Sequence, residues 1–153
     1  MFLEIERKFL VSGFVSEGLR CKKMKQAYLA KDGATVRVRI ADNKAFLTIK
    51  GKTEGFSRAE FEYEIPMEDA NAMMELAIYP PVIKTRYYAE VGGKTWEVDV
   101  FEGENKGLVM AEIELSSKDE EFTLPEWAVE EVTGDKRYYN AYLAKNPYKN
   151  WQK

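Results

Sequence analysis

The chain opens with Met1-Phe2-Leu3-Glu4-Ile5-Glu6-Arg7-Lys8-Phe9-Leu10-Val11, a run in which charged and apolar side chains alternate. Successive side chains of a β-strand point to opposite faces, so Glu4, Glu6 and Lys8 share one face of such a strand. The other face is apolar apart from Arg7. A single strand of this kind has its charged side in water or forms one wall of a polar site, and its own pattern does not distinguish the two.

The same alternation recurs along the chain and predicts seven further strands, at residues 25–30, 34–40, 45–50, 58–65, 82–90, 95–101 and 108–115. Short turns with the composition of hairpins, Lys31-Asp32-Gly33 and Gly92-Gly93, connect some of them. Hairpin connections make neighbouring strands antiparallel. Eight antiparallel strands suffice to close into a barrel, so we predict a mainly β (α+β) fold built on an eight-stranded antiparallel β-barrel.

Helical spacing is confined to a few short segments. Residues 68–79 carry an apolar stripe and end at Pro80-Pro81. Residues 127–132 have the composition of a short helix, and Thr133 is a candidate cap for a last helix that continues to Ala144. We expect these helices to pack on the outside of the barrel.

Length and composition predict one domain, residues 1–153, with 45% hydrophobic and 32% charged residues. No apolar run approaches the roughly 18 residues that cross a membrane, and no signal peptide is visible, so we expect a cytoplasmic protein without a membrane partner. Cys21 is the only cysteine and histidine is absent, which excludes a Ser-His-Asp triad and a His-ligated zinc. The net charge of −3 argues against nucleic-acid binding.

The charged faces of the predicted strands can point outward to water or inward to line a tunnel, and periodicity alone leaves both arrangements open. Their basic members are Lys8, Arg37, Arg39, Lys50, Lys84 and Arg86, and their acidic members include Glu4, Glu6, Glu60, Glu62, Glu64, Asp99, Glu112 and Glu114. Salt bridges between strands would use the same pattern, but a surface pair contributes only ~0–1 kcal/mol. Converging cations suit several phosphates, and clustered carboxylates suit Mg²⁺ or Mn²⁺. The chemistry therefore favours the tunnel.

At this point the chain resembles the CYTH superfamily, the triphosphate tunnel metalloenzymes. The family signature, an N-terminal Glu-x-Glu-x-Lys strand, matches residues 4–8. The resemblance continues through Gln26-Ala27-Tyr28-Leu29, Arg37-Val38-Arg39, Thr48-Ile49-Lys50, Ser57-Arg58-Ala59-Glu60-Phe61-Glu62, Lys84-Thr85-Arg86, Val98-Asp99-Val100-Phe101, Glu112-Ile113-Glu114 and Val132-Thr133-Gly134-Asp135-Lys136-Arg137-Tyr138. The short chain is most similar to the small bacterial inorganic triphosphatases of this family.

The resemblance implies a role for each of these charged residues. Phosphate would be bound by Lys8, Arg37, Arg39, Lys50, Lys84 and Arg86. Metal would be held by Glu4, Glu6, Glu112 and Glu114, with Glu60, Glu62 and Asp99 as further ligands or as groups that hydrogen-bond to the ligands. The bacterial subgroup also implies a catalytic pair, Tyr28 and Lys50. A nearby ammonium and a metal would lower the tyrosine pKa from about 10, which would let Tyr28 accept a proton from an attacking water. Alternatively, Tyr28 packs and hydrogen-bonds while metal alone positions the water.

The expected activity is hydrolysis of inorganic triphosphate to pyrophosphate and phosphate, with Mg²⁺ or Mn²⁺ as cofactor. One alternative is a nucleoside or thiamine triphosphatase, or an adenylate cyclase of the class IV type, although no pocket for a base is evident in the sequence. Another is a non-catalytic module that binds polyphosphate. The partner in each case is a small polyanion, and the sequence is compatible with a monomer or a homodimer.

Overall fold

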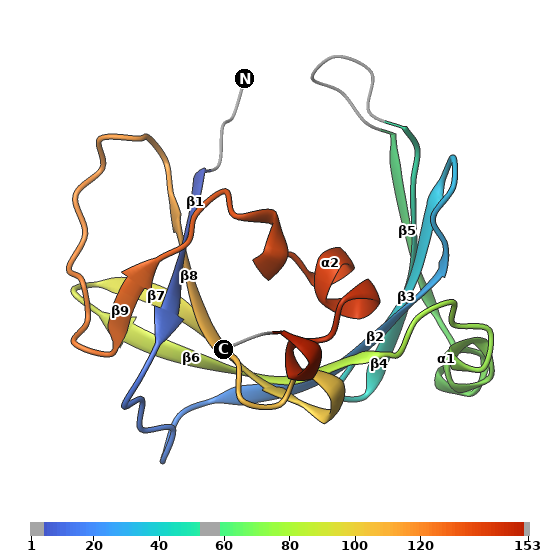
Figure 1. Ribbon diagram of the computed structural model, residues 1–153, viewed down its shortest axis with the longest axis horizontal. Coiled ribbons are helices and arrows are strands. Elements are labelled where there is room, and N and C mark those ends of the chain that lie inside the picture. Colours follow the sequence, from blue (N-terminus) through green and yellow to red (C-terminus); the bar gives the residue numbers. More distant parts are fainter. Residues whose placement is uncertain (1–4, 53–58, 152–153) are drawn as a thin grey trace.

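The structure is a computed structural model and describes residues 5–52 and 59–151 (Figure 1). Its strands are β1 (Ile5–Val11), β2 (Cys21–Ala30), β3 (Thr35–Ala41), β4 (Lys44–Lys50), β5 (Glu60–Ile65), β6 (Val82–Val91), β7 (Lys94–Glu102), β8 (Val109–Leu115) and β9 (Ala128–Glu131). Its α-helices are α1 (Met67–Met74) and α2 (Asn140–Lys145), and its 3₁₀ turns are η1 (Gly103–Asn105), η2 (Lys136–Tyr138) and η3 (Tyr148–Asn150). None of the described helices is long and apolar enough to cross a membrane.

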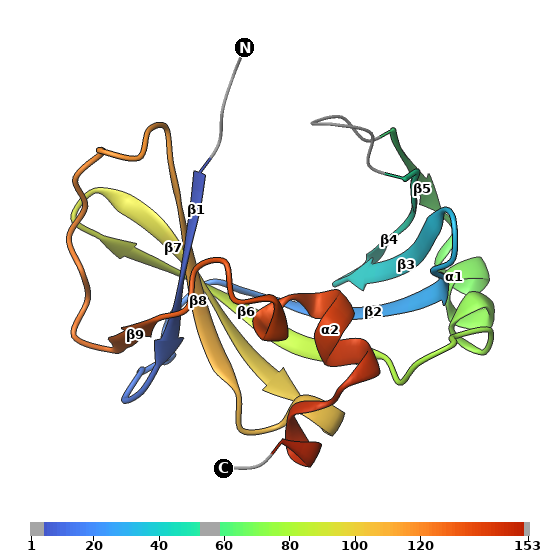
Figure 2. The same cartoon turned by 45° about the horizontal axis from the view of Figure 1, so that its top comes forward.

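All nine strands belong to one antiparallel sheet with the order β5-β4-β3-β2-β6-β7-β8-β1-β9. The sheet curls strongly, so that it has a concave and a convex face (Figures 1 and 2). The predicted mainly β, antiparallel class with a few helices is confirmed. The closure of the barrel differs, because among the described residues β5 and β9 are the two edges of the sheet and do not pair with each other.

The strand β9 forms one of the two edges of the sheet, next to β1. The sequence predicted a short helix here, but residues 128–131 are extended and pair with β1, placing Phe9 opposite Glu131. The pairing continues beyond the strand, where the Val132 amide donates to the Lys8 carbonyl oxygen at 2.8 Å. On the convex face Arg7 forms a bidentate ion pair with Glu131, with N–O distances of 2.6 and 2.7 Å. Strand pairing and this ion pair override the local helical tendency, and they give Arg7 a partner on an otherwise apolar face.

Two apolar clusters cover the convex face. Around Trp96, which is fully buried, β1, β6, β7 and β8 pack beneath the chain segments that contain Phe14, Phe122 and Trp127. At the other end of the sheet α1 packs on β2, β3 and β4 through the buried Ala70. The helix α1 thus lies outside the curve, as predicted (Figure 1).

The C-terminal segment, residues 132–151, differs from the prediction, because it lies within the concave side of the sheet and not outside it (Figures 1 and 2). Toward one end of the strands the concave face becomes apolar, and Phe101 and Met110 form a third buried cluster there with Leu143 of α2. Thr133 does not cap a helix: its hydroxyl accepts a hydrogen bond from the Lys8 amide at 2.9 Å, and α2 begins only at Asn140. Apolar contacts with the inner face place this segment beside the charged side chains.

Candidate functional site

The charged side chains of the strands share the concave face, which resolves the sequence ambiguity in favour of the inward arrangement. The register places Gln26 opposite Arg39, Arg37 opposite Thr48, and Lys8 opposite Glu112. Cations are concentrated on β3, β4 and β6, while carboxylates lie on β7, β8 and β1 and also on the edge strand β5, next to β4. We call these regions the basic half and the acidic half of the concave face.

A cavity of about 260 Å³ opens in the basic half. It is lined by Tyr28, Thr35, Arg37, Thr48, Lys50, Tyr139, Asn140 and Ala141. The two residues predicted as a catalytic pair, Tyr28 and Lys50, therefore face one space. The contribution of residues 139–141 was not foreseen, because the sequence predicted a C-terminal helix but gave no sign that its first turn enters the site.

Arg37 and Arg39 are partly buried, and the described carboxylates form no ion pair with either of them. Their hydrogen-bond partners are neutral: Arg39 Nε donates to Gln26 Oε1 at 3.0 Å, and Arg37 Nη2 donates to Thr48 Oγ1 at 3.4 Å. Within the described residues, the buried Nε of Arg37 has no acceptor. Burial and the nearby charges of Arg37 and Arg86 lower the pKa of Arg39 to about 10. This arginine pair therefore has no directly paired carboxylate among the described residues, whereas Lys50 in the same half is paired with Glu60.

Tyr28 is buried between this arginine pair and the C-terminal segment. Burial raises the pKa of its hydroxyl, and Arg37 and Arg39 lower it by less. The lowering that was expected from neighbouring cations is therefore outweighed, because a phenolate in this position would lose its hydration. The Tyr28 side chain is therefore a protonated phenol at neutral pH, which can form hydrogen bonds.

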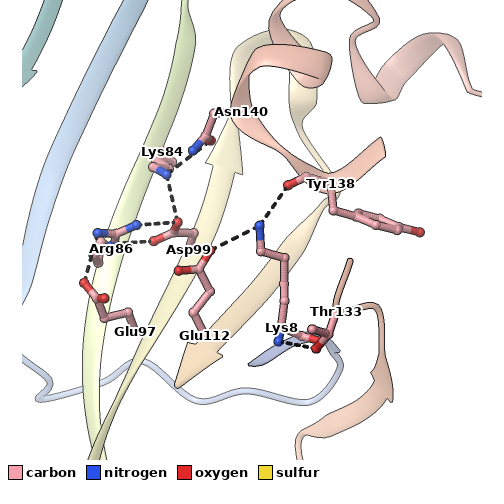
Figure 3. Close-up of polar contacts among 9 residues, drawn as sticks. All are labelled: Lys8, Lys84, Arg86, Glu97, Asp99, Glu112, Thr133, Tyr138 and Asn140. Carbon is pink, nitrogen blue, oxygen red and sulfur yellow. Dashed lines mark hydrogen bonds and ion pairs between the residues drawn. The ribbon is translucent and has the colours of Figure 1, made fainter. Parts of the chain in front are cut away.

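A buried ion-pair network separates the two halves (Figure 3). Asp99 of β7 accepts two hydrogen bonds from Arg86, from Nε at 2.8 Å and from Nη2 at 3.0 Å, and it pairs with Lys84 Nζ at 2.9 Å. Arg86 Nη1 also donates to Glu97 Oε2 at 2.9 Å. Although burial raises the pKa of Asp99, the ion pairs with Lys84 and Arg86 outweigh burial and lower it overall. Lys84 and Arg86, both predicted to bind phosphate, are thus already paired with carboxylates.

The acidic half contains Glu6, Glu112 and Glu114 on the neighbouring strands β1 and β8. Burial and the charges of the other two carboxylates raise the pKa of Glu6. Lys8 Nζ lies 3.3 Å from Glu112 Oε1 and 3.4 Å from the Tyr138 carbonyl oxygen (Figure 3). A second cavity, of about 320 Å³, is lined here by Arg20, Tyr88, Lys94, Thr95, Glu97, Glu112 and Glu114.

The structure describes all but one of the predicted metal ligands. Glu4 lies outside the described residues, and in the part of the chain that is described no three acidic or Cys side chains are grouped closely enough to hold an ion. Of the other predicted ligands, Glu60 pairs with Lys50 at 3.3 Å and Glu62 accepts a hydrogen bond from Thr48 at 3.0 Å. Together with Asp99 they contact cations or hydroxyl groups, and their role as ligands stays a prediction.

Comparison with known proteins agrees with this arrangement. Residues 3–139 match the family model of the CYTH domain. The chain is 49% identical over 152 residues to an inorganic triphosphatase of Acetivibrio thermocellus, with 97% of each chain covered. It is 38% identical over 146 residues to an inorganic triphosphatase of Nitrosomonas europaea, with 92% of this chain and 96% of the relative covered.

Among solved structures, the crystal structure of the inorganic triphosphatase NE1496 superimposes with a TM-score of 0.81 at 36% identity, covering 94% of this chain and 95% of that one. The family match spans most of the sequence. It agrees with the signature residues at the start of the chain, the curled antiparallel sheet and the charged concave face. The chain therefore belongs to the CYTH family.

Proposed function

We propose that this protein is a divalent-metal-dependent hydrolase that cleaves inorganic triphosphate to pyrophosphate and phosphate on its concave face. The observation that carries the proposal is the pair Arg37 and Arg39, which are partly buried on β3 and form no ion pair with a described carboxylate, while Arg37 shares its cavity with Lys50. Cations kept out of water at a cost in stability are typical of an anion-binding site. The names of the relatives at 49% and 38% identity, both inorganic triphosphatases, support the same substrate.

The charge of the cavity lining favours an anion, because Arg37 and Lys50 both line it. Arginine offers paired N–H donors to phosphate oxygens, and the Lys50 ammonium adds a compact charge from the neighbouring strand β4. We infer that Arg37, Arg39 and Lys50 bind the triphosphate directly, while Lys84 and Arg86 add positive potential from within the ion-pair network.

The acidic half has the donor chemistry of a Mg²⁺ or Mn²⁺ site. Carboxylate oxygens are the ligands that these ions prefer. Burial and then repulsion by Glu112 and Glu114 raise the pKa of Glu6, and a bound cation would relieve this repulsion. We propose these three residues, with Glu4, as the metal ligands, and the described ones, whose side chains are not grouped closely enough to hold an ion in this structure, would have to converge on the metal as it binds. When bound, the metal supplies charge neutralisation to the phosphate oxygens and activation to the attacking water.

Two residues of the basic half are placed to serve the chemical step. The Tyr28 hydroxyl, protonated at neutral pH, lines the same cavity as Lys50 and is proposed to orient water or a phosphate oxygen by hydrogen bonding. Lys50 is proposed to offset negative charge as it develops on the departing phosphate. The cytoplasmic location and the monomeric or homodimeric state remain predictions from the sequence.

The proposal is tested by phosphate release from tripolyphosphate, ATP, thiamine triphosphate and pyrophosphate, each with Mg²⁺, Mn²⁺ or EDTA. We expect metal-dependent turnover of tripolyphosphate, which the Lys50→Ala variant loses while keeping the melting temperature of the parent. If ATP or thiamine triphosphate is hydrolysed faster than tripolyphosphate, that compound is the preferred substrate instead. Tight binding of tripolyphosphate without turnover would indicate a binding module, and a fully active Lys50→Ala variant would remove that residue from the site.

A further inference from the structure

The first residue of α2, Asn140, lies where the ion-pair network meets the cavity of the basic half. Its Oδ1 accepts a hydrogen bond from Lys84 Nζ at 3.3 Å, and the same residue lines the cavity with Tyr28, Arg37 and Lys50. Figure 3 shows its side chain reaching toward the Lys84 ammonium from the C-terminal segment. Asn140 therefore joins a buried cation of β6 to the space in which we propose that the triphosphate binds.

Besides Asn140, the Lys84 ammonium lies close to one carboxylate and one aromatic ring among the described residues. Its side chain is 2% exposed, Asp99 Oδ2 lies 2.9 Å away, and the centroid of the Phe101 ring lies 5.5 Å away. Asp99 is shared with Arg86, which forms two hydrogen bonds with it. With Asp99 alone, the ammonium would be drawn toward the sheet, while the amide oxygen of Asn140 holds it toward the C-terminal segment. Because that oxygen is neutral, it orients the ammonium without adding a second negative charge to that of Asp99.

A second cation ties down the same stretch of chain. Lys8 Nζ donates to the carbonyl oxygen of Tyr138 at 3.4 Å and lies 4.9 Å from the centroid of the Tyr139 ring. Residues 138–140 are thus held between β1 and β6, one strand from each half of the concave face. This double attachment fixes Asn140 relative to both halves.

We propose that Asn140 is a positioning residue, which aims the Lys84 ammonium at the triphosphate through its side-chain oxygen. The inference rests on the proposed function and names a residue beyond the charged set. It predicts that Asn140 acts through Lys84 and contributes little to substrate binding by direct contact. Loss of a hydrogen bond to a charged group typically lowers binding or turnover by about 10- to 100-fold, so we expect a loss of that size in kcat/KM for the Asn140→Ala variant.

A double-mutant cycle with Lys84 separates positioning from direct contact. In a Lys84→Met background, Asn140→Ala is expected to cause less than about a twofold further change, because its target is gone. An unchanged 10-fold or greater loss in that background would overturn the proposal and make Asn140 a direct substrate contact. Asn140→Asp keeps the acceptor but adds a negative charge beside the cavity, so KM should rise while kcat changes less. An Asn140→Asp variant with the KM of the parent would contradict the placement of Asn140 beside the bound triphosphate.

The matched control is Asn146→Ala, directly after the last residue of the same helix, where the side-chain amide donates a hydrogen bond to the Tyr142 carbonyl oxygen. It should retain the kcat/KM of the parent, and thermal unfolding of every variant identifies those that have lost the fold.

The affinity for tripolyphosphate, measured by calorimetry in EDTA, gives a readout that does not depend on turnover. If the parent binds without hydrolysis, the proposed function fails, while weaker binding by Asn140→Ala still supports the positioning role. Equal affinities for parent and variant would refute it.

Discussion

Replacing Arg39 by glutamine is expected to make the protein more stable and much less active. The pKa of Arg39 is lowered from the ordinary arginine value to about 10, mainly by burial and then by the neighbouring Arg37 and Arg86. At about 1.4 kcal/mol for each tenfold change in the acidity constant, the charged guanidinium costs the folded state about 3 kcal/mol. The full cost applies at neutral pH, because both the folded and the unfolded pKa lie far above 7.

The substitution removes this cost but not all of the local contacts. The amide of glutamine can still donate to Gln26 Oε1, which accepts from Arg39 Nε in the parent. The shorter side chain loses some packing, which we set at about 1 kcal/mol. The net gain is then about 2 kcal/mol, or a rise of about 4–8 °C in melting temperature for a chain of this length. Turnover of tripolyphosphate should fall at least about 100-fold, because a charged hydrogen-bond donor to phosphate is lost.

The assay is thermal unfolding at pH 7 with and without tripolyphosphate, together with phosphate release. Arg7→Gln is the matched control, since Arg7 lies on the convex face of the same sheet and is paired with Glu131. That variant should lose about 0.5–1 kcal/mol and keep full activity. Tripolyphosphate should raise the melting temperature of the parent and of Arg7→Gln but not that of Arg39→Gln. An Arg39→Gln protein that melts below the parent, or is still stabilised by tripolyphosphate, would refute the reasoning.

The Tyr28→Phe variant should keep its melting temperature within about 2 °C and lose about 10²–10⁴-fold in kcat if the hydroxyl acts in the chemical step; an unchanged kcat would reduce Tyr28 to a packing role. Removal of divalent metal with EDTA should abolish turnover, and Mg²⁺ should stabilise the parent more than Glu6→Gln in thermal unfolding. Equal stabilisation of the two would exclude Glu6 as a ligand. Because Arg7 lowers the pKa of Glu131, their pair contributes stability above the ordinary glutamate pKa of 4.5 and loses it as the pH falls through the lower folded pKa. The difference in melting temperature between the parent and Arg7→Gln should therefore shrink in acid, and a constant difference would contradict the ion pair.

The sequence was sufficient to predict which side chains share the functional face. The period of two along a strand is strict, so once Arg37, Arg39 and Glu112 are assigned to strands their common face follows from antiparallel pairing. Periodicity does not specify the direction in which a sheet curls. That direction depends on which apolar face is covered, and both α1 and the C-terminal segment carry apolar residues that suit either side. The structure resolved this by placing one on each face.

The remaining differences arise from contacts between distant parts of the chain. Residues 128–131 form a strand because β1, more than 110 positions earlier, offers an unpaired edge. The pairing of Lys84 and Arg86 with Asp99 depends on the register of β6 and β7, and the raised pKa of Tyr28 depends on the C-terminal segment that buries it. Local propensity contains no information on these contacts, so the roles of Lys84 and Asn140 could not be read from the sequence.

The pairing of β1 with β8 and β9 has a consequence for the order in which the two halves form during synthesis. The part of the basic half that carries Arg37, Arg39 and Lys50 is built from hairpins between consecutive strands, β2 to β4, which can pair soon after they leave the ribosome. Glu6 meets its partner Glu114 only after more than 100 further residues have been added. At about 5–20 residues per second, the first strand waits roughly 5–20 s for its neighbours. A nascent chain that stops before β8 would therefore contain Arg37 and Arg39 but not Glu112 and Glu114, so its acidic half would be incomplete.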